Sequence, residues 1–112
     1  MNMIAELRET LRMEIRPNSE ELEYLEAVIQ RKDVGLLTAL LAKHLGSAAK
    51  EPGREANLPA EIETLVDSMG GLRTEQSFFY RKEDDATILF AVLWPWKSDP
   101  EKITLKAGIG LL

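Results

Sequence analysis

Few side chains in this sequence have the type and spacing that catalysis or metal binding requires. His44 is the only histidine and there is no cysteine, so neither a pair of histidine ligands nor a Cys-His catalytic pair can form. A single histidine near a helix end more often interacts with the helix dipole. Glu83, Asp84 and Asp85 are contiguous, but they lack the alternating ligands and the glycine of a calcium-binding loop and are typical of a turn. We therefore predict no catalytic residue and no metal site.

Cofactor-binding patterns are also missing. None of the seven glycines belongs to a phosphate-binding loop or to a dinucleotide fingerprint that follows a strand. The lack of cysteine excludes disulfides, cysteine-ligated zinc and iron-sulfur clusters within the chain. We therefore predict no cofactor, and we regard an enzymatic role as uncertain and less favoured.

The most distinctive tripeptide is Trp94-Pro95-Trp96. Its two tryptophans share one face of a strand, and the proline between them cannot donate to a sheet, so we expect a bulge or a strand end there. Such aromatic side chains either pack in the core or anchor a partner or ligand. Arg73 and Arg81 could hold an anion between them, but arginines also protect an edge strand from aggregation.

Length and charge limit the class of protein. The 112 residues fit a single domain, and the net charge of -5 disfavours nucleic-acid binding. The charged first fifteen residues do not resemble a signal peptide. The most apolar run, residues 86–96, is about half as long as a membrane-crossing helix. We expect a cytoplasmic protein that binds neither nucleic acid nor membrane.

The first part of the chain shows helical periodicity. Apolar residues recur every three or four positions, which predicts four helices, at about 2–16, 18–32, 33–46 and 58–70. Asn18 with Glu21 is a candidate capping box for the second helix, and Ser19 is the alternative cap. The apolar stripe of that helix comprises Leu22, Leu25, Val28 and Ile29.

After Gly71 the period changes from 3.6 to 2. Three alternating runs, 72–82, 86–96 and 102–112, are separated by turn residues and predict an antiparallel meander. Helices followed by strands indicate the α+β class, with a helical part at about 2–70 and a β-meander at about 72–112 of one domain. The segment 47–57, which lacks periodicity, is expected to be either a linker or a mobile lid.

A two-residue first turn and a four-residue second turn predict the strand register. Phe79 then pairs with Phe90, and Trp94 with Leu105, on one face that the helices would cover. The opposite face is also apolar, which is unusual for an antiparallel sheet with one wet side. It is covered either by some of the helices, by a second subunit or by a ligand. The residues predicted to bind a partner there are Phe78, Tyr80, Leu89, Leu93, Gly108 and Gly110.

Two functional hypotheses follow. The first is a small regulatory or protein-interaction domain that uses this apolar face to bind itself, as a homodimer, or another protein. The second is a small-molecule-binding domain or enzyme with an apolar pocket between sheet and helices, closed by segment 47–57. Its candidate lining residues are Tyr80, Trp94, Trp96, Arg81 and His44.

The last strand provides a test of the predicted faces. Ile109 is expected on the core face and Gly110 on the partner face, because side chains alternate along a strand. The predicted effect of Ile109→Asp is therefore unfolding. Gly110→Asp is predicted to leave the fold intact and to disrupt association.

Overall fold

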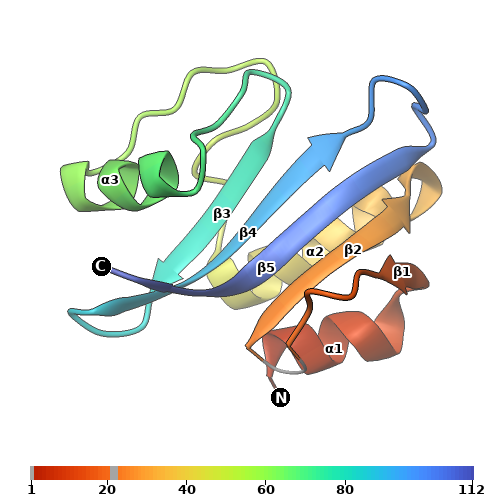
Figure 1. The fold of residues 1–112 in the computed structure, drawn as a ribbon, viewed down its shortest axis with the longest axis horizontal. Helices are drawn as coiled ribbons and strands as arrows, with labels where there is room; N and C mark the ends of the chain where they lie inside the picture. Colours follow the sequence, from red (N-terminus) through yellow and green to blue (C-terminus); the bar gives the residue numbers. More distant parts are fainter. Residues whose placement is uncertain (1, 21–22) are drawn as a thin grey trace.

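Residues 2–20 and 23–112 are described by a computed structural model of the chain (Figure 1). Across these residues the structure has three α-helices, a short 3₁₀ turn and one five-stranded sheet. The elements in chain order are α1 (Met3–Thr10), β1 (Met13–Ile15), β2 (Tyr24–Gln30), η1 (Arg31–Asp33), α2 (Val34–Leu45), α3 (Ala60–Ser68), β3 (Ser77–Lys82), β4 (Thr87–Pro95) and β5 (Lys102–Leu111).

The sheet has the strand order β1-β2-β5-β4-β3, and every neighbouring pair is antiparallel. The C-terminal strand β5 is therefore central, with the N-terminal β2 on one side and β4 on the other. This arrangement brings residues from the two ends of the chain side by side, for example Leu25 and Ala107.

Helices α1 and α2 cover one face of the sheet. Asn2 caps α1 by accepting hydrogen bonds from the Ile4 and Ala5 amides through its side-chain oxygen. The buried residues of α1 and α2 pack on alternate residues of the strands, and together these residues form the larger core. The fully buried members of this core with large side chains are Leu7, Leu25, Ile29, Leu37, Leu41 and Leu105.

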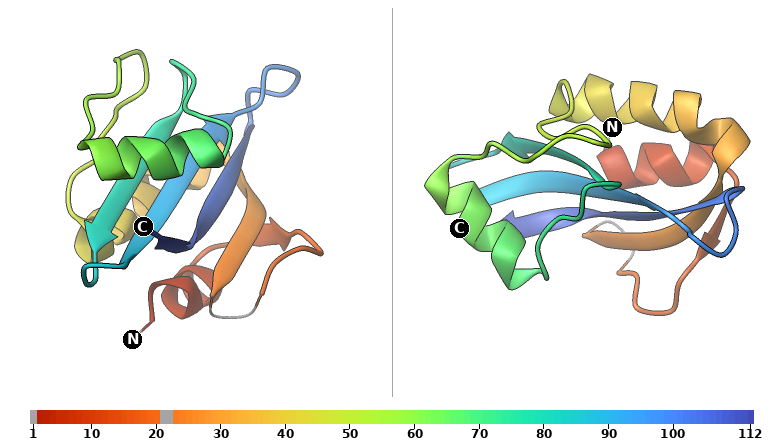
Figure 2. Two further views of the ribbon diagram at one scale, coloured as in Figure 1. Left: turned by 60° about the vertical axis from the view of Figure 1, so that its left-hand side comes forward. Right: turned by 90° about the horizontal axis from the view of Figure 1, so that it is seen from above.

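Helix α3 packs on the opposite face, over β3 and β4 (Figure 2). Ile62 and Val66 of α3 are buried there against Phe78, Ile88 and Phe90. The chain thus covers both faces of its sheet with helices, which is one of the alternatives left open by the sequence.

The predicted fold of about four helices and a three-stranded meander was wrong. The predicted second helix contains strand β2, and β1 lies within the predicted first helix. Leu25, Ala27 and Ile29 alternate inward on β2 and are fully buried, so this segment completes the larger core as a strand. The meander is consequently part of a five-stranded sheet.

The predicted capping box does not form at Asn18. The Asn18 amide donates to the Glu26 carboxylate instead, and the Ser19 hydroxyl both accepts from the Glu26 amide and donates to the Glu26 carbonyl. These bonds hold the segment before β2 against the strand. Glu21 and Leu22, the other predicted members of this cap and stripe, lie outside the described residues.

Both predicted hairpin registers were wrong by one residue. Phe79 pairs with Ala91, and Trp94 pairs with Thr104. The first loop contains Ala86 in addition to the predicted Asp84 and Asp85. The Asp84 carboxylate stabilises this longer loop by accepting hydrogen bonds from the amides of Ala86 and Thr87 and from the Thr87 hydroxyl. A shift of one residue places the side chains of one strand on the opposite face of the sheet relative to those of its partner strand.

The predicted third helix and the glycines predicted to end the third and fourth helices are confirmed. Helix α2 spans Val34–Leu45 and ends at Gly46, whose φ of 83° is the left-handed conformation that glycine tolerates. Gly70 and Gly71 end α3, again with positive φ, and the Gly71 amide donates to the Val66 carbonyl. None of the helices in the described part of the chain has the length and apolar content to cross a bilayer.

Candidate functional site

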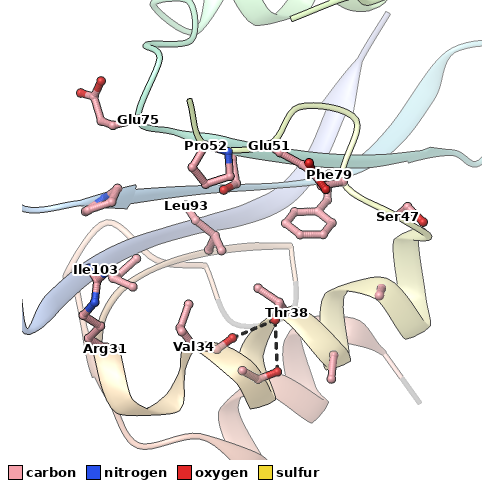
Figure 3. A pocket seen from close by; sticks show the side chains of 16 residues that line it. Arg31, Val34, Thr38, Ser47, Glu51, Pro52, Glu75, Phe79, Leu93 and Ile103 are labelled. Carbon is pink, nitrogen blue, oxygen red and sulfur yellow. Dashed lines mark hydrogen bonds between the residues drawn. The ribbon is translucent and has the colours of Figure 1, made fainter. Parts of the chain in front are cut away.

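A groove of about 730 Å³ lies between α2 and the sheet. Phe79, Leu93 and Ile103 project from the sheet into it, opposite Val34 and Thr38 of the helix (Figure 3). The helix side is otherwise built from small residues, which leaves space between helix and sheet. We call this the α2 groove; its other lining residues are Arg31, Gly35, Ala39, Ala42, Ser47, Ala48, Glu51, Pro52, Glu75, Ser77 and Pro95.

The charges of the α2 groove lie at its rim. Arg31, in the turn before α2, is at the helix side, and its guanidinium donates to the Pro100 carbonyl at 3.4 Å. Glu51 and Glu75 lie on the opposite rim (Figure 3). The groove therefore offers a largely apolar middle and charged groups only at its edges, which is the usual construction of a small-molecule site.

Lys50 fixes the segment that forms one wall of this groove. Its side chain is only 4% exposed, and its ammonium donates to the carbonyls of Glu51, Thr74 and Gln76 at 2.7–3.1 Å. Its backbone also forms a β-bridge with Phe78. Burial lowers the pKa of the Lys50 ammonium, which the charge of Glu75 partly counters. The predicted lid segment 47–57 is thus tied to the sheet near its start.

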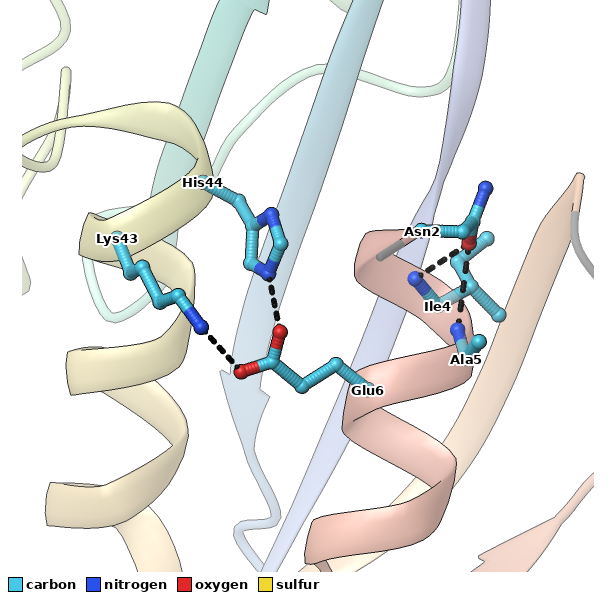
Figure 4. Close-up of polar contacts among 6 residues, drawn as sticks. All are labelled: Asn2, Ile4, Ala5, Glu6, Lys43 and His44. Atoms are coloured by element: carbon cyan, nitrogen blue, oxygen red, sulfur yellow. Dashed lines mark hydrogen bonds and ion pairs between the residues drawn. The ribbon is translucent and has the colours of Figure 1, made fainter.

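Helix α1 is tied to the C-terminal turn of α2 by one carboxylate. Glu6 accepts from the Lys43 ammonium at 2.7 Å and lies 2.9 Å from His44 Nε2 (Figure 4). Both hydrogen bonds lower the pKa of Glu6 below its ordinary value, and the bond from Lys43 has the larger effect. His44 therefore has a carboxylate partner on α1 as well as its place at the C-terminal end of α2.

A second cavity, of about 480 Å³, lies on the other face of the sheet. It is formed where the chain leaves α3 and turns back over β2, β5 and β4. We call this the α3 pocket; it is lined by Tyr24, Val66, Met69, Gly70, Gly71, Leu72, Arg73, Gln76, Phe90, Val92, Trp94 and Lys106.

Glu26 of β2 interacts with several polar side chains next to this pocket. Burial disfavours its ionisation, but hydrogen bonds from Asn18 and Tyr24 and the charge of Lys106 outweigh it, so the pKa of Glu26 is lowered. The Tyr24 hydroxyl donates to the Glu26 carboxylate at 3.0 Å. Burial, together with this carboxylate, raises the pKa of Tyr24 to about 12, so Tyr24 remains a neutral donor near neutral pH.

The structure does not bring the predicted pocket residues together. His44 contacts Glu6 at the end of α2, and Arg81 pairs with Glu83 at 2.7 Å beside the first hairpin. Trp96 donates from its indole nitrogen to the Thr104 hydroxyl. Of the predicted lining residues, Trp94 alone lines a cavity described above, the α3 pocket. The predicted location between sheet and helix nevertheless holds the α2 groove.

The predicted partner-binding residues are divided between the two faces. Phe78 and Tyr80 stack with ring centroids 5.7 Å apart on the α3 face, whereas Leu89 and Leu93 pack with the larger core. Gly108 and Gly110 are buried, beside Glu23 and Leu65 respectively. Their part in binding a partner stays a prediction.

Several residues in or beside these cavities were not predicted from the sequence. Lys50, Gln76 and Lys106 acquire their roles through neighbours distant in sequence, such as Thr74 for Lys50 and Trp94 for Lys106. For Gln76 and Lys106 the one local signal is their position in the sequence. Gln76 directly precedes β3, and Lys106 alternates with buried residues of β5.

Comparisons with known proteins give no relative. No protein-family model matches the chain, and neither a curated protein nor a solved structure is significantly similar to it. Within residues 2–20 and 23–112, no three His, Asp or Glu side chains gather as a group that could hold a metal ion.

Proposed function

We propose that this chain is a small-molecule-binding domain and that the α2 groove is its binding site. The observation that carries the proposal is the groove itself: about 730 Å³ with an apolar floor and charges at the rim. Ligand sites of proteins typically occupy about 300–1,000 Å³ and have this distribution of polar groups.

The construction of the walls supports a preformed site. The floor residues Phe79, Leu93 and Ile103 are buried in the larger core and cannot move freely. A side wall is held by the Lys50 ammonium and its three carbonyl acceptors. A site of this kind loses little conformational entropy when a ligand enters, because its walls are already ordered.

The direct test is a ligand screen by NMR on the ¹⁵N-labelled chain, using a library of small apolar compounds with one polar group. Binding in the groove is expected to shift the amide signals of Gly35, Thr38, Ala39 and Ser47, which line it. If no compound binds, or if every shift falls on residues away from the groove, the proposal is wrong.

A second candidate is association with another copy of the chain. Ile109 and Leu111 are 49% and 74% exposed on β5, and Ile109 lies opposite Leu89 on β4. Neighbouring exposed apolar side chains favour an interface. Size-exclusion chromatography with light scattering tests this candidate, and a monomer at high concentration contradicts it.

A further inference from the structure

The α3 pocket lies on the opposite face of the sheet from the α2 groove and has a different chemical character. Its walls are mostly apolar, and the polar groups among its lining residues are cationic or neutral: Lys106, Arg73, Gln76 and the Tyr24 hydroxyl. None of the residues that line it is acidic. The Tyr24 hydroxyl already donates to Glu26, so the donors left for an anion in this pocket are those of the cationic and amide side chains.

Gln76 supplies a side-chain amide in this wall. The residue is only 5% exposed, and its side-chain oxygen accepts from the Arg73 amide at 2.7 Å. That bond fixes the orientation of the side-chain amide. The other end of the amide, Nε2, carries two hydrogens that can be donated to a ligand or to solvent in the pocket.

Lys106 places a positive charge at the same cavity. Its ammonium lies 4.5 Å from the ring centroid of Trp94, which also lines the pocket. Glu26 forms an ion pair with the ammonium at 3.6 Å, a contact that occupies at most one of its three hydrogens. The ammonium can therefore still donate to a ligand.

The remaining walls select the body of the ligand. Phe90, Val92, Val66 and Leu72 form an apolar lining beside the Trp94 ring. Aromatic rings prefer to pack against each other in offset or edge-to-face arrangements. A flat apolar molecule fits this lining, and an anionic group at its edge would satisfy Gln76 and Lys106 together.

We propose that the α3 pocket binds a planar aromatic carboxylate, whose anion accepts hydrogen bonds from Gln76 Nε2 and Lys106 Nζ while its ring packs beside Trp94. This inference is independent of the α2 groove, because the two cavities share no lining residue.

The probes for the test are 2-naphthoate and its neutral counterpart 2-naphthamide, titrated into the full chain by isothermal calorimetry. The two molecules share a ring system and differ in charge. We expect the carboxylate to bind about tenfold more tightly than the amide, since hydrogen bonds to a charged acceptor are the stronger ones. Equal affinity of the two probes, or no binding of 2-naphthoate, overturns the proposal.

Matched variants locate the bound anion. Lys106→Met keeps the apolar stem on Trp94 but removes the charge, and we expect it to weaken 2-naphthoate binding about tenfold. The control is Lys102→Met: the Lys102 ammonium lies 5.2 Å from the Trp96 ring on the same face but does not line the pocket. It should change the affinity less than about twofold. Equal losses in both variants contradict the assignment.

Gln76→Glu gives a second, independent readout. It keeps the oxygen that accepts from the Arg73 amide and replaces the Nε2 donor by a second oxygen. Binding of 2-naphthoate should be lost, whereas binding of 2-naphthamide should be retained within about threefold. Circular dichroism checks that each variant is folded. If instead 2-naphthoate binding is abolished by Gly35→Leu in the α2 groove and unaffected by Lys106→Met, the ligand lies in the groove and this inference fails while the proposed function stands.

Discussion

Gly110 of β5 lies directly beneath Leu65 of α3, so that a Cβ atom at position 110 would be 2.7 Å from Leu65 Cδ2. Ile88 Cγ1 would be 3.3 Å away on the same side. The contact explains why a glycine stands at this place in a strand: α3 approaches the sheet closely here.

We predict that Gly110→Asp strongly destabilises the domain. The new side chain must push aside the Leu65 and Ile88 side chains, which costs about 1–3 kcal/mol for overpacking, and its carboxylate would be buried without a partner, which adds to that cost. Ile109→Asp, at a half-exposed position, should change the free energy of unfolding by only about 1 kcal/mol. Urea denaturation of the two variants measures both values.

The sequence predicts the reverse, with unfolding by Ile109→Asp and an intact fold in Gly110→Asp. The difference arises from the strand register. Residues 109 and 110 point to opposite faces, and the sequence cannot show which face α3 covers. If Ile109→Asp unfolds the chain and Gly110→Asp does not, the sheet register described above is incorrect.

The sequence predicts those parts of the fold whose signals are local. Helix α2 and the glycine ends of α2 and α3 follow from apolar periodicity and from the conformational freedom of Gly46 and Gly70. The three C-terminal strands follow from alternation. These elements would have the same pattern in any tertiary environment.

Strand β2 could not be recognised in this way. Leu25, Val28 and Ile29 fit one stripe of a helix, while Leu25, Ala27 and Ile29 fit one face of a strand equally well. The neighbouring glutamates favour a helix locally. Pairing with β5 and full burial of the second set override that preference.

The cavities were predictable only as a general location between sheet and helices. Phe79 and Leu93 share the face that forms the floor of the α2 groove only in the observed register. In the predicted register they were assigned to opposite faces. Gln76 and Arg73 meet through a hydrogen bond in an irregular segment, for which the sequence carries no periodic signal.

Lys50 gives a second prediction, about the wall of the α2 groove. Lys50→Met should reduce the free energy of unfolding by about 1–3 kcal/mol, because three carbonyls lose a buried donor. Amide hydrogen exchange should rise in residues 47–53. The control is Lys97→Met, at an exposed lysine in the second hairpin loop, which should leave both quantities unchanged. Equal exchange in the two variants would show that Lys50 does not hold the segment.

Glu6 gives a prediction for pH. Its pKa is lowered in the folded state, so its ionisation stabilises the fold above the ordinary pKa near 4.5, and this contribution is lost as the pH falls through the folded-state value. Glu6→Gln should therefore be less stable than wild type at pH 6, with a difference that shrinks toward pH 3. Thermal melts across this range measure it.

The matched control for that experiment is Glu9→Gln, which removes the same charge from an exposed position of α1. Its difference from wild type should be smaller at pH 6 than that of Glu6→Gln. A pH dependence identical in the two variants would indicate that net charge, rather than the contacts of Glu6 with Lys43 and His44, determines the acid sensitivity.

Gly35, on the wall of the α2 groove, allows stability and binding to be separated. A Cβ at this position would meet no heavy atom within 4 Å, and the backbone has the ordinary helical conformation of the first turn of α2. Gly35→Leu should therefore stabilise the domain by up to about 1 kcal/mol, because glycine is a poor helix former.

The same leucine side chain would occupy the α2 groove and abolish binding of any compound found there. Leu36→Gln, at the adjacent exposed position outside the groove, should leave that binding intact. Ligand titrations and melting curves of the two variants measure both effects. A Gly35→Leu variant that binds the compound as tightly as wild type would show that the ligand site lies elsewhere, whatever its melting temperature.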